Sequence, residues 1–263
     1  MRRPGHIPKA RIATLHRVRS VIITGISRGL GSAFFDEFRV AGDRILGLGR
    51  RFTDAQHAAE RLEPQRVRLR QVDFSYLNSL PAAPELSSFV HGAGHGEGPG
   101  GNGELVLVHN AAMIGPVGAI GTLAADELQS AVAVNLTAPM LLTNAVMAAA
   151  GTQREITVLF ISSGAARHNV AGWAAYSATK LAGESFFEAL AAQHAGNPRI
   201  RVVNVNPGTM DTDMQGRIRE HAQRDVYFPD RDRFVGLHER GELTAPAAVA
   251  RRILVEHLGI ASS

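Results

Sequence analysis

The chain has 263 residues, of which 45% are hydrophobic and 20% are charged, and its formal net charge is +4. This length suits one large α/β domain, and the hydrophobic content excludes a mostly disordered chain. The absence of cysteine excludes a disulfide framework, a thiolate zinc site and a cysteine nucleophile, and it fits the cytoplasm, where we expect the protein to reside. No run approaches 18 consecutive apolar residues, so we expect no membrane-spanning helix and no membrane partner.

The positive charge is concentrated at the amino terminus. Residues 1–20 hold six of the 28 basic residues and no acidic one, so the rest of the chain carries 22 basic against 24 acidic residues. We interpret residues 1–20 as a basic, disordered tail and residues 21–263 as a single domain. The alternative is a tail that binds a nucleic acid or a membrane surface. The chain has neither interleaved aromatic residues nor a recognition-helix pattern, so we expect no nucleic-acid partner.

Beyond the tail, strands and helices are predicted to alternate. Six segments, most of them apolar runs, are predicted as strands, and they cover residues 21–24, 44–48, 67–72, 105–109, 156–161 and 200–205. Helical patterns fill most of the intervals, notably at residues 29–41, 127–150, 174–194 and 246–258. Strands that are apolar throughout and separated by helices form a parallel sheet covered on both faces. We therefore predict an α/β fold, a doubly wound parallel sheet of the Rossmann type flanked by helices on both faces.

Two segments depart from this alternation. Residues 91–103 are dominated by glycine and are predicted to form a flexible surface loop. The two histidines of this loop have no further ligands beside them, so we expect no metal site. Residues 212–243 form a long, charged excursion after the sixth strand. They are either a substrate lid or an ordinary pair of surface helices.

The first strand runs into a glycine-rich turn that opens the first helix. Gly25, Gly29 and Gly31 leave room for a pyrophosphate near the backbone, and the helix N-terminus offers unpaired N–H groups to an anion. The glycines would also serve close helix–strand packing, which is the alternative reading. The second strand ends at Arg50, without the acidic residue that binds an unphosphorylated ribose, and Arg28 can reach the same corner. Two guanidinium groups at that corner favour NADP over NAD.

Polar and small residues follow the third and fourth strands. Asp73 and Phe74 end the third strand, where the carboxylate would accept a hydrogen bond from the adenine amino group. Asn110 and Ala111 end the fourth strand, where small side chains let a cofactor pass close to the backbone. Ligands of open parallel sheets bind at the carboxyl ends of successive strands, so we place these residues at the cofactor site.

The catalytic chemistry is predicted to follow the fifth strand. Ser163 ends that strand, and Tyr176 and Lys180 are one helical turn apart, so their phenol and ammonium groups share a helix face. A nearby cation stabilises a phenolate, and we expect it to lower the pKa of Tyr176 from about 10 toward the working pH. Such a pair exchanges the proton that interconverts a carbonyl and an alcohol. The alternative is a buried tyrosine beside a lysine whose amine reaches solvent.

Together these residues resemble the short-chain dehydrogenase/reductase family. The pattern comprises Thr-Gly-x-x-x-Gly-x-Gly at 24–31, Asn-Ala at 110–111, a serine 13 residues before Tyr-x-x-x-Lys, and Pro-Gly-x-x-x-Thr at 207–212. The resemblance implies a catalytic tetrad of Asn135, Ser163, Tyr176 and Lys180. In such enzymes the tyrosine is the general acid in reduction and the serine bonds the substrate carbonyl. The lysine contacts the nicotinamide ribose, and the asparagine supports the lysine through a water.

The same resemblance implies a bound NADP(H). The residues expected to contact it are Gly25, Ser27, Arg28, Gly29, Leu30, Gly31, Arg50, Asp73, Phe74, Asn110, Ala111, Tyr176, Lys180, Pro207, Gly208, Thr209 and Thr212.

One branch of the family is more similar still. Segments 161–166, 172–173 and 207–215 are similar to sepiapterin reductases and benzil reductases, which reduce vicinal dicarbonyl compounds with NADPH. This resemblance implies an NADPH-dependent carbonyl reductase whose small-molecule carbonyl substrate contacts Ser163, Trp173, Tyr176 and Met214. We also expect a homodimer or homotetramer. Two alternatives stay open: a catalytically silent NADP-binding regulator, and a short-chain dehydrogenase acting on a secondary alcohol or a 3-oxoacyl substrate.

The chain departs from the family pattern in three places. His109 stands where the family has an asparagine, and Ala112 stands where it has a glycine. The family usually continues past the last helix into a seventh strand that closes the substrate pocket. The chain ends at Ser263, so we expect that last strand, and the acidic pterin anchor near it, to be missing.

Overall fold

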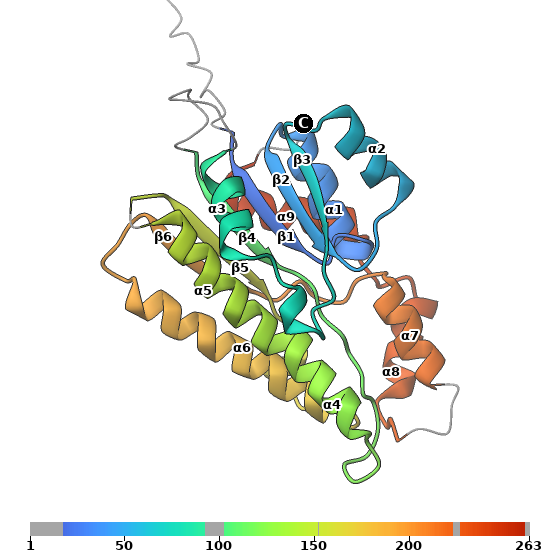
Figure 1. The fold of residues 1–263 in the computed structure, drawn as a ribbon. Helices are drawn as coiled ribbons and strands as arrows, with labels where there is room; N and C mark the ends of the chain where they lie inside the picture. The colour runs from blue at the N-terminus through green and yellow to red at the C-terminus, as the bar shows by residue number, and fades with distance from the viewer. Residues whose placement is uncertain (1–17, 93–102, 152, 223–226, 261–263) are drawn as a thin grey trace, which may run out of the picture.

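The computed structural model describes residues 18–92, 103–151, 153–222 and 227–260. Its centre is a parallel sheet of six strands in the order β3-β2-β1-β4-β5-β6 (Figure 1). The strands are β1 (Ser20–Thr24), β2 (Arg44–Gly49), β3 (Val67–Gln71), β4 (Leu105–His109), β5 (Ile156–Ile161) and β6 (Ile200–Val205). The predicted fold class is confirmed, and each predicted strand agrees with the observed one to within one residue at either end. The strand order reverses between β1 and β4, which is where open sheets bind their ligands.

Helices cover both faces of this sheet (Figure 1). One apolar layer lies between the sheet and helices α1 and α9, and the other between the sheet and helices α3, α5 and α6. Within the described residues the α-helices are α1 (Gly29–Val40), α2 (Asp54–Leu62), α3 (Ala83–His91), α4 (Ala125–Val132), α5 (Ala138–Ala150), α6 (Ala174–Gln193), α7 (Asp213–Ala222), α8 (Arg231–Glu239) and α9 (Pro246–Leu258).

Successive residues of each central strand enter opposite apolar layers. In β1, Val21 and Ile23 pack beneath α1 and α9, whereas Ile22 packs toward α3, α5 and α6. Because both layers are closed to solvent, every position of such a strand favours an apolar residue, and the strand reads as a continuous apolar run. This is the physical reason that the strands were predictable from the sequence.

The predicted helix at residues 127–150 is three consecutive segments, α4, a π-helical turn at Ala133–Thr137, and α5. By length and hydropathy, Ala125–Ala150 is the one candidate membrane span among the described residues, and an 18-residue window within it has a mean hydropathy of 1.5. Its apolar character has a simpler source, because Leu142 and Val146 are buried against the sheet. The helix is therefore part of the core that covers β4 and β5.

The excursion at residues 212–243 contains α7 and α8, as the surface-helix reading predicted, and the two helices lie beside the carboxyl ends of the strands (Figure 1). Residues 223–226 between them lie outside the described residues, and so does most of the glycine-rich segment, residues 93–102. Among the described residues no strand pairs with the outer edge of β6.

Part of the segment assigned to the tail belongs to the folded domain. Ser20 begins β1, and the guanidinium group of Arg19 donates to the carbonyl of Leu258 at 3.1 Å. The backbone N–H of Arg19 donates to the buried carboxylate of Asp43 at 2.9 Å. Residues 1–17 lie outside the described residues, so the proposed disorder of the tail stays a prediction.

Helix α6 lies unusually close to β5. A Cβ atom at Gly183 would be 2.4 Å from the ring of Phe160, which is itself stacked on Phe187 with ring centres 4.7 Å apart. Both rings are almost fully buried, so Phe160 has no free space into which it can move. The glycine thus sets the distance between α6 and β5.

We predict that Gly183→Ala destabilises the protein, by about 1–2 kcal/mol. Overpacking of a filled core costs about 1–3 kcal/mol, and alanine's better helix propensity returns at most about 1 kcal/mol. Denaturant unfolding measures the change. The control is Gly196→Ala, because no atom lies within 4 Å of the added methyl group at that position. Equal stability losses in the two variants would contradict the proposed packing constraint.

Candidate active site

The glycine-rich turn lies between β1 and α1, at the switch point of the sheet. A Cβ at Gly31 would be 2.1 Å from the carbonyl oxygen of Gly25, and a Cβ at Gly25 would be 2.9 Å from the Cα of Ala111. Gly25 and Gly29 also have positive φ angles, of 74° and 56°. The turn therefore packs directly on the end of β4, and only glycine fits at these positions.

Hydrogen bonds tie this turn to β4. The hydroxyl oxygen of Thr24 accepts from the backbone N–H groups of Asn110 and Ala111, both at 3.0 Å. The side-chain amide of Asn110 donates to the carbonyl oxygens of Thr24 and Gly25, at 3.1 and 3.0 Å. Asn110 thus has a positioning role that the sequence did not indicate: it holds the glycine turn against the neighbouring strand.

The N-terminus of α1 fits a negatively charged ligand. Its N-cap residue, Arg28, makes no side-chain cap hydrogen bond, and the first turn contains no acidic residue. Helix α2 differs, because Thr53 and Gln56 form a reciprocal capping box at its start. The uncapped N–H groups and positive dipole end of α1 face the switch point, so the turn can hold the diphosphate of a dinucleotide.

The two arginines that the sequence placed at one corner have different surroundings in the structure. Arg50 follows β2 and is exposed beside the turn, where the hydroxyl group of Ser27 donates to the carbonyl of Arg51 at 2.5 Å. The guanidinium group of Arg28 instead donates to Asp213, at the start of α7, at 3.0 Å. Arg50 and Arg51 are thus both exposed basic residues at the end of β2.

Asp73 and Phe74 follow β3 with different surroundings. Burial alone would raise the pKa of Asp73, but hydrogen bonds from Ser75 and the charge of Arg50 outweigh it and hold the pKa below its ordinary value. Asp73 is thus a carboxylate at the end of β3, and its contact with the adenine stays a prediction. Phe74 is buried and packs into the apolar layer on the α5 side.

The serine, tyrosine and lysine that the sequence singled out lie together at the carboxyl edge of β5. Ser163 caps a short 3₁₀ turn, and its side chain has a hydrogen bond with Tyr176. The adjacent Ser162 faces away and donates to the buried carboxylate of Glu184 at 2.6 Å. The structure therefore supports Ser163, and not Ser162, as the serine of the site.

Burial shifts the pKa values of Tyr176 and Lys180 in opposite directions. It lowers the pKa of Lys180 to about 8, although the charge of Glu184 acts the other way. It raises the pKa of Tyr176, and the hydrogen bond with Ser163 opposes this only in part. The expectation that Lys180 lowers the pKa of Tyr176 is thus wrong for this structure. Its ammonium group lies 5.9 Å from the centre of the tyrosine ring and donates to the carbonyl of Ile161 at 2.7 Å.

Asn135 lies in the π-helical turn between α4 and α5 and is 1% exposed. Its amide exchanges two hydrogen bonds with the backbone of Met113, both at 2.9 Å, and donates to the hydroxyl of Thr179 at 3.1 Å. Thr179 precedes Lys180, so Asn135 joins the loop after β4 to the catalytic part of α6. Its support of Lys180 through a water stays a prediction.

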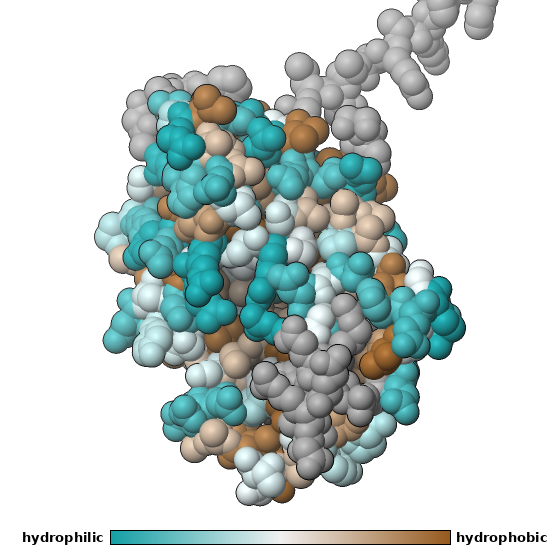
Figure 2. Space-filling view, turned by 90° about the vertical axis from the view of Figure 1, so that its right-hand side faces the viewer, coloured by the Kyte–Doolittle hydropathy of each residue, from teal (hydrophilic) through white to brown (hydrophobic). Residues whose placement is uncertain are grey.

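An aromatic cluster lies beside Tyr176. Trp173 packs edge-on against Tyr176, with ring centres 5.9 Å apart, and stacks on Phe228 at 5.4 Å. Phe234 of α8 completes the cluster, and Met214 of α7 packs against it. These side chains face inward, and the outer face on that side of the molecule is a mixture of hydrophilic and hydrophobic residues (Figure 2). The predicted substrate residues Trp173 and Met214 are thus brought together with Tyr176.

The segment after β6 closes the other side of the site. Thr212 packs its methyl group against Gly29, where a Cβ would be 3.3 Å away, and its hydroxyl accepts from the N–H of Gln215 at the start of α7. Pro207 is buried, and its carbonyl accepts from Arg252 at 3.1 Å. Gly208 has a positive φ of 81°, and Thr209 accepts a backbone hydrogen bond from Thr244. The segment therefore lies against the glycine turn, and its contact with a nicotinamide stays a prediction.

Two buried groups near the site had no place in the sequence prediction. Glu184 is 5% exposed and accepts hydrogen bonds from Ser162 and from Arg167, the latter at 2.8 Å. Its position four residues after Lys180 on one helix was a signal that could have found it. His109 is the second group, and only its departure from the family pattern marked it.

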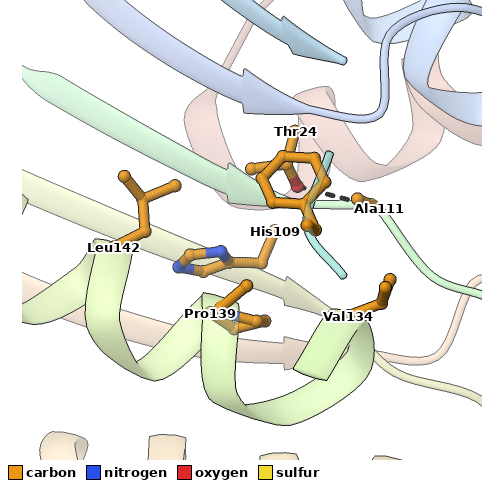
Figure 3. Close-up of a pocket in the computed structure, with 8 residues that line it drawn as sticks. Thr24, His109, Ala111, Val134, Pro139 and Leu142 are labelled. Carbon is orange, nitrogen blue, oxygen red and sulfur yellow. Dashed lines mark hydrogen bonds between the residues drawn. The ribbon is translucent and has the colours of Figure 1, made fainter. Parts of the chain in front are cut away.

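Figure 3 shows the imidazole of His109 between the end of β4 and α5, beside Pro139 and Leu142. Its Nε2 lies 2.7 Å from the hydroxyl oxygen of Thr143, and its Nδ1 has no partner among the described residues. Burial, with a smaller contribution from the charge of Lys180, lowers the pKa of His109 to about 3. The ring is therefore neutral at physiological pH.

A doubly wound parallel sheet with a glycine turn at its switch point, and a serine, tyrosine and lysine at the same edge, defines an oxidoreductase of the Rossmann type. Residues 19–223 match the family described as short chain dehydrogenase. A benzil reductase ((S)-benzoin forming) of Bacillus subtilis (strain 168) is 30% identical over 235 residues, which cover 89% of this chain and 90% of that protein. The chain therefore belongs to the short-chain dehydrogenase family.

Other relatives agree with this assignment. A sepiapterin reductase of Meriones unguiculatus is 29% identical over 240 residues, which cover 89% of this chain and 88% of that protein. Among solved structures, the KRED1-Pglu enzyme has a TM-score of 0.72 and 28% identity, covering 89% of this chain and 91% of that one. The family expected from the sequence motifs, and the benzil and sepiapterin reductase branch within it, are confirmed.

We predict that acid destabilises the protein through His109. The unfolded chain binds a proton at this residue near pH 6.5, whereas the folded protein does so only near pH 3, so stability is lost as the pH falls below 6.5. Between pH 7.5 and pH 5 the loss from this residue is about 2 kcal/mol. His109→Asn removes this contribution, so urea unfolding at the two pH values should give a smaller difference than in the wild type. The control is His238→Asn, at an exposed histidine. If His109→Asn lost as much stability between pH 7.5 and pH 5 as this control, the acid sensitivity would not come from His109.

Proposed function

We propose that this protein is an NADPH-dependent carbonyl reductase that transfers a hydride to a ketone, with vicinal dicarbonyl compounds as the preferred substrates. The observation that carries the proposal is the cluster of Ser163, Tyr176 and Lys180 at the same sheet edge as the glycine turn. The reduced nicotinamide, when bound, supplies the hydride. The residues of this chain supply the proton and hold the carbonyl oxygen.

The raised pKa of Tyr176 suits it to the reductive direction. A phenol whose pKa is raised by burial stays protonated at neutral pH, so its hydroxyl can donate a proton to the carbonyl oxygen as negative charge develops there. The hydroxyl of Ser163 lies next to the phenol and can donate a second hydrogen bond to the same oxygen. Lys180 is held by the carbonyl of Ile161 and places a positive charge behind the tyrosine ring.

The composition of the cluster beside Tyr176 supports an apolar substrate. The cluster around Tyr176 consists of Ile114, Ala165, Trp173, Phe228 and Phe234, with Met214 beside it. Such a wall suits an aryl ketone, and relatives at about 30% identity are named as benzil reductases, benzil being a vicinal diketone with two phenyl rings. The two alternatives differ from the proposal in their reactions. A silent NADP-binding regulator consumes no NADPH, and a dehydrogenase of other alcohols or 3-oxoacyl substrates acts on those compounds rather than on vicinal dicarbonyls.

NADP(H) is the proposed cofactor. Arg50 is exposed at the end of β2, next to the hydrogen-bonded pair of Ser27 and Arg51, and no acidic residue follows that strand to repel a phosphate. A guanidinium group there can bind the 2′-phosphate of NADPH through two parallel hydrogen bonds.

We also propose that the protein is a homodimer or homotetramer of the cytoplasm. Apolar side chains stay exposed on the outer faces of α5 and α6, namely Met140, Leu141 and Leu181. A helix whose inner face packs on the sheet and whose outer face is still apolar suits burial against a second copy. Light scattering on the purified protein measures the assembly, and a monomer at micromolar concentration would contradict this proposal.

Tyr176→Phe is predicted to reduce the turnover of benzil with NADPH by about 100- to 10,000-fold, the usual contribution of a general acid. Binding of NADPH, measured by the fluorescence of the reduced cofactor, should stay nearly unchanged, because the ring keeps its packing. Tyr76→Phe, at a tyrosine that is 71% exposed, is the matched control and should retain turnover. Substantial turnover in Tyr176→Phe would overturn the mechanism, and a wild type that binds NADPH without consuming it across a panel of diketones would favour the silent regulator.

Arg50→Ala is predicted to lower the ratio of kcat/KM with NADPH to that with NADH by about 10- to 100-fold. This is the effect expected from the loss of hydrogen bonds to one charged group. Arg61→Ala, at an exposed arginine in the last turn of α2, is the control and should leave the ratio unchanged. An unchanged ratio in Arg50→Ala would exclude this residue as the source of the cofactor preference.

A further inference from the structure

Trp173 occupies a special position next to the proposed proton donor. It immediately precedes α6 and is three residues before Tyr176, against which its ring packs edge-on. The residue is 4% exposed, and the rings of Phe228 and Phe234 cover it, with centre distances of 5.4 and 4.8 Å.

The indole N–H of Trp173 is buried without a hydrogen-bond partner among the described residues. Its surroundings explain why, since the cluster consists of hydrocarbon side chains and the ring of Tyr176, none of which offers a good acceptor. A buried donor left unpaired is unfavourable, and native structures usually provide it with a partner. A phenylalanine would fill the same cluster without this penalty, so the unpaired indole N–H indicates a functional role.

Two other buried polar atoms of this region lack partners, the hydroxyl of Ser177 and the side-chain carbonyl of Gln215. Ser177 is the next residue along α6 and points to a different side of the helix from Tyr176. The oxygen of Gln215 is an acceptor and cannot bind a carbonyl. Trp173 is thus the unpaired donor that belongs to the aromatic cluster.

Vicinal dicarbonyl compounds have the matching acceptor. One carbonyl oxygen takes the hydrogen bonds of Tyr176 and Ser163, and the second oxygen, on the adjacent carbon, enters the same apolar cluster and needs a donor of its own. We propose that the indole N–H of Trp173 donates a hydrogen bond to the non-reacting carbonyl oxygen and so selects vicinal dicarbonyls over monoketones. This inference rests on the proposed reductase function.

The covering rings are compatible with this role. Phe228 and Phe234 both come from the α7–α8 excursion, and the carbonyl of Tyr227 would be 2.6 Å from a Cβ at Gly172, the residue before Trp173. Because Trp173 is 4% exposed, a ligand contacts the indole only when the side chains of Phe228 and Phe234 move aside.

The kinetic test compares benzil with deoxybenzoin, the same molecule with one carbonyl replaced by a methylene group. Trp173→Phe should lower kcat/KM for benzil by about tenfold, the effect of one lost hydrogen bond, and leave that for deoxybenzoin within about twofold. Phe228→Leu alters the same wall without removing a donor, and it should affect both ketones equally. Equal losses for both ketones in Trp173→Phe would show that the tryptophan is only a wall and would overturn the inference.

A second measurement uses the wild-type protein, so it does not depend on whether a variant folds. Trp173 is the single tryptophan of the chain, so the ¹⁵N-labelled protein gives one indole N–H resonance. In the presence of NADP⁺, which prevents turnover, benzil should shift its proton downfield and deoxybenzoin should not. No shift with bound benzil overturns the inference and leaves the proposed function standing. If the wild type reduces neither ketone with NADPH, the proposed function fails, and the inference fails with it.

Discussion

The close approach of α6 to β5 is the constraint on which the site depends. Gly183 allows the helix to lie against the ring of Phe160, and one helical turn earlier the ammonium group of Lys180 reaches the carbonyl of Ile161. Ser163 follows β5 two residues after Ile161, so this single contact brings the serine beside Tyr176. A helix held farther from the strand would separate the hydroxyl that binds the carbonyl oxygen from the phenol that protonates it.

The same burial that assembles the site also sets its chemistry. It disfavours the charged forms of both α6 groups, so the tyrosine stays neutral and the lysine is poised near pH 8. The carboxylate of Glu184 limits this effect on Lys180, and its hydrogen bonds with Ser162 and Arg167 hold it in place. Glu184 therefore has two effects: it accepts the hydrogen bond of Ser162, and it stabilises the charged form of Lys180.

Features that depend on residues close together in the sequence could be predicted from it, whereas features that depend on contacts between distant residues could not. The central strands were predictable because burial on both faces selects apolar residues, and the pairing of Tyr176 with Lys180 was predictable because helical spacing alone places them on one face. The sign of the pKa shift at Tyr176 was not, since it depends on how deeply the folded protein buries the phenol. The sequence indicated the neighbouring cation but not this burial.

Long-range contacts also explain the remaining differences. The partner of Arg28 is Asp213, 185 residues along the chain, and no local pattern relates the two. The role of Asn110 in holding the glycine turn was equally invisible, because it depends on the register of β1 beside β4.

The ion pair between Arg28 and Asp213 joins the glycine turn to the start of α7. Both side chains are at least half exposed, at 50% and 63%. Exposed ion pairs of this kind contribute about 0–1 kcal/mol, so thermal motion breaks the pair readily. It therefore holds the two segments together only weakly, and it would present little barrier to a nucleotide that enters or leaves the proposed cofactor site between them.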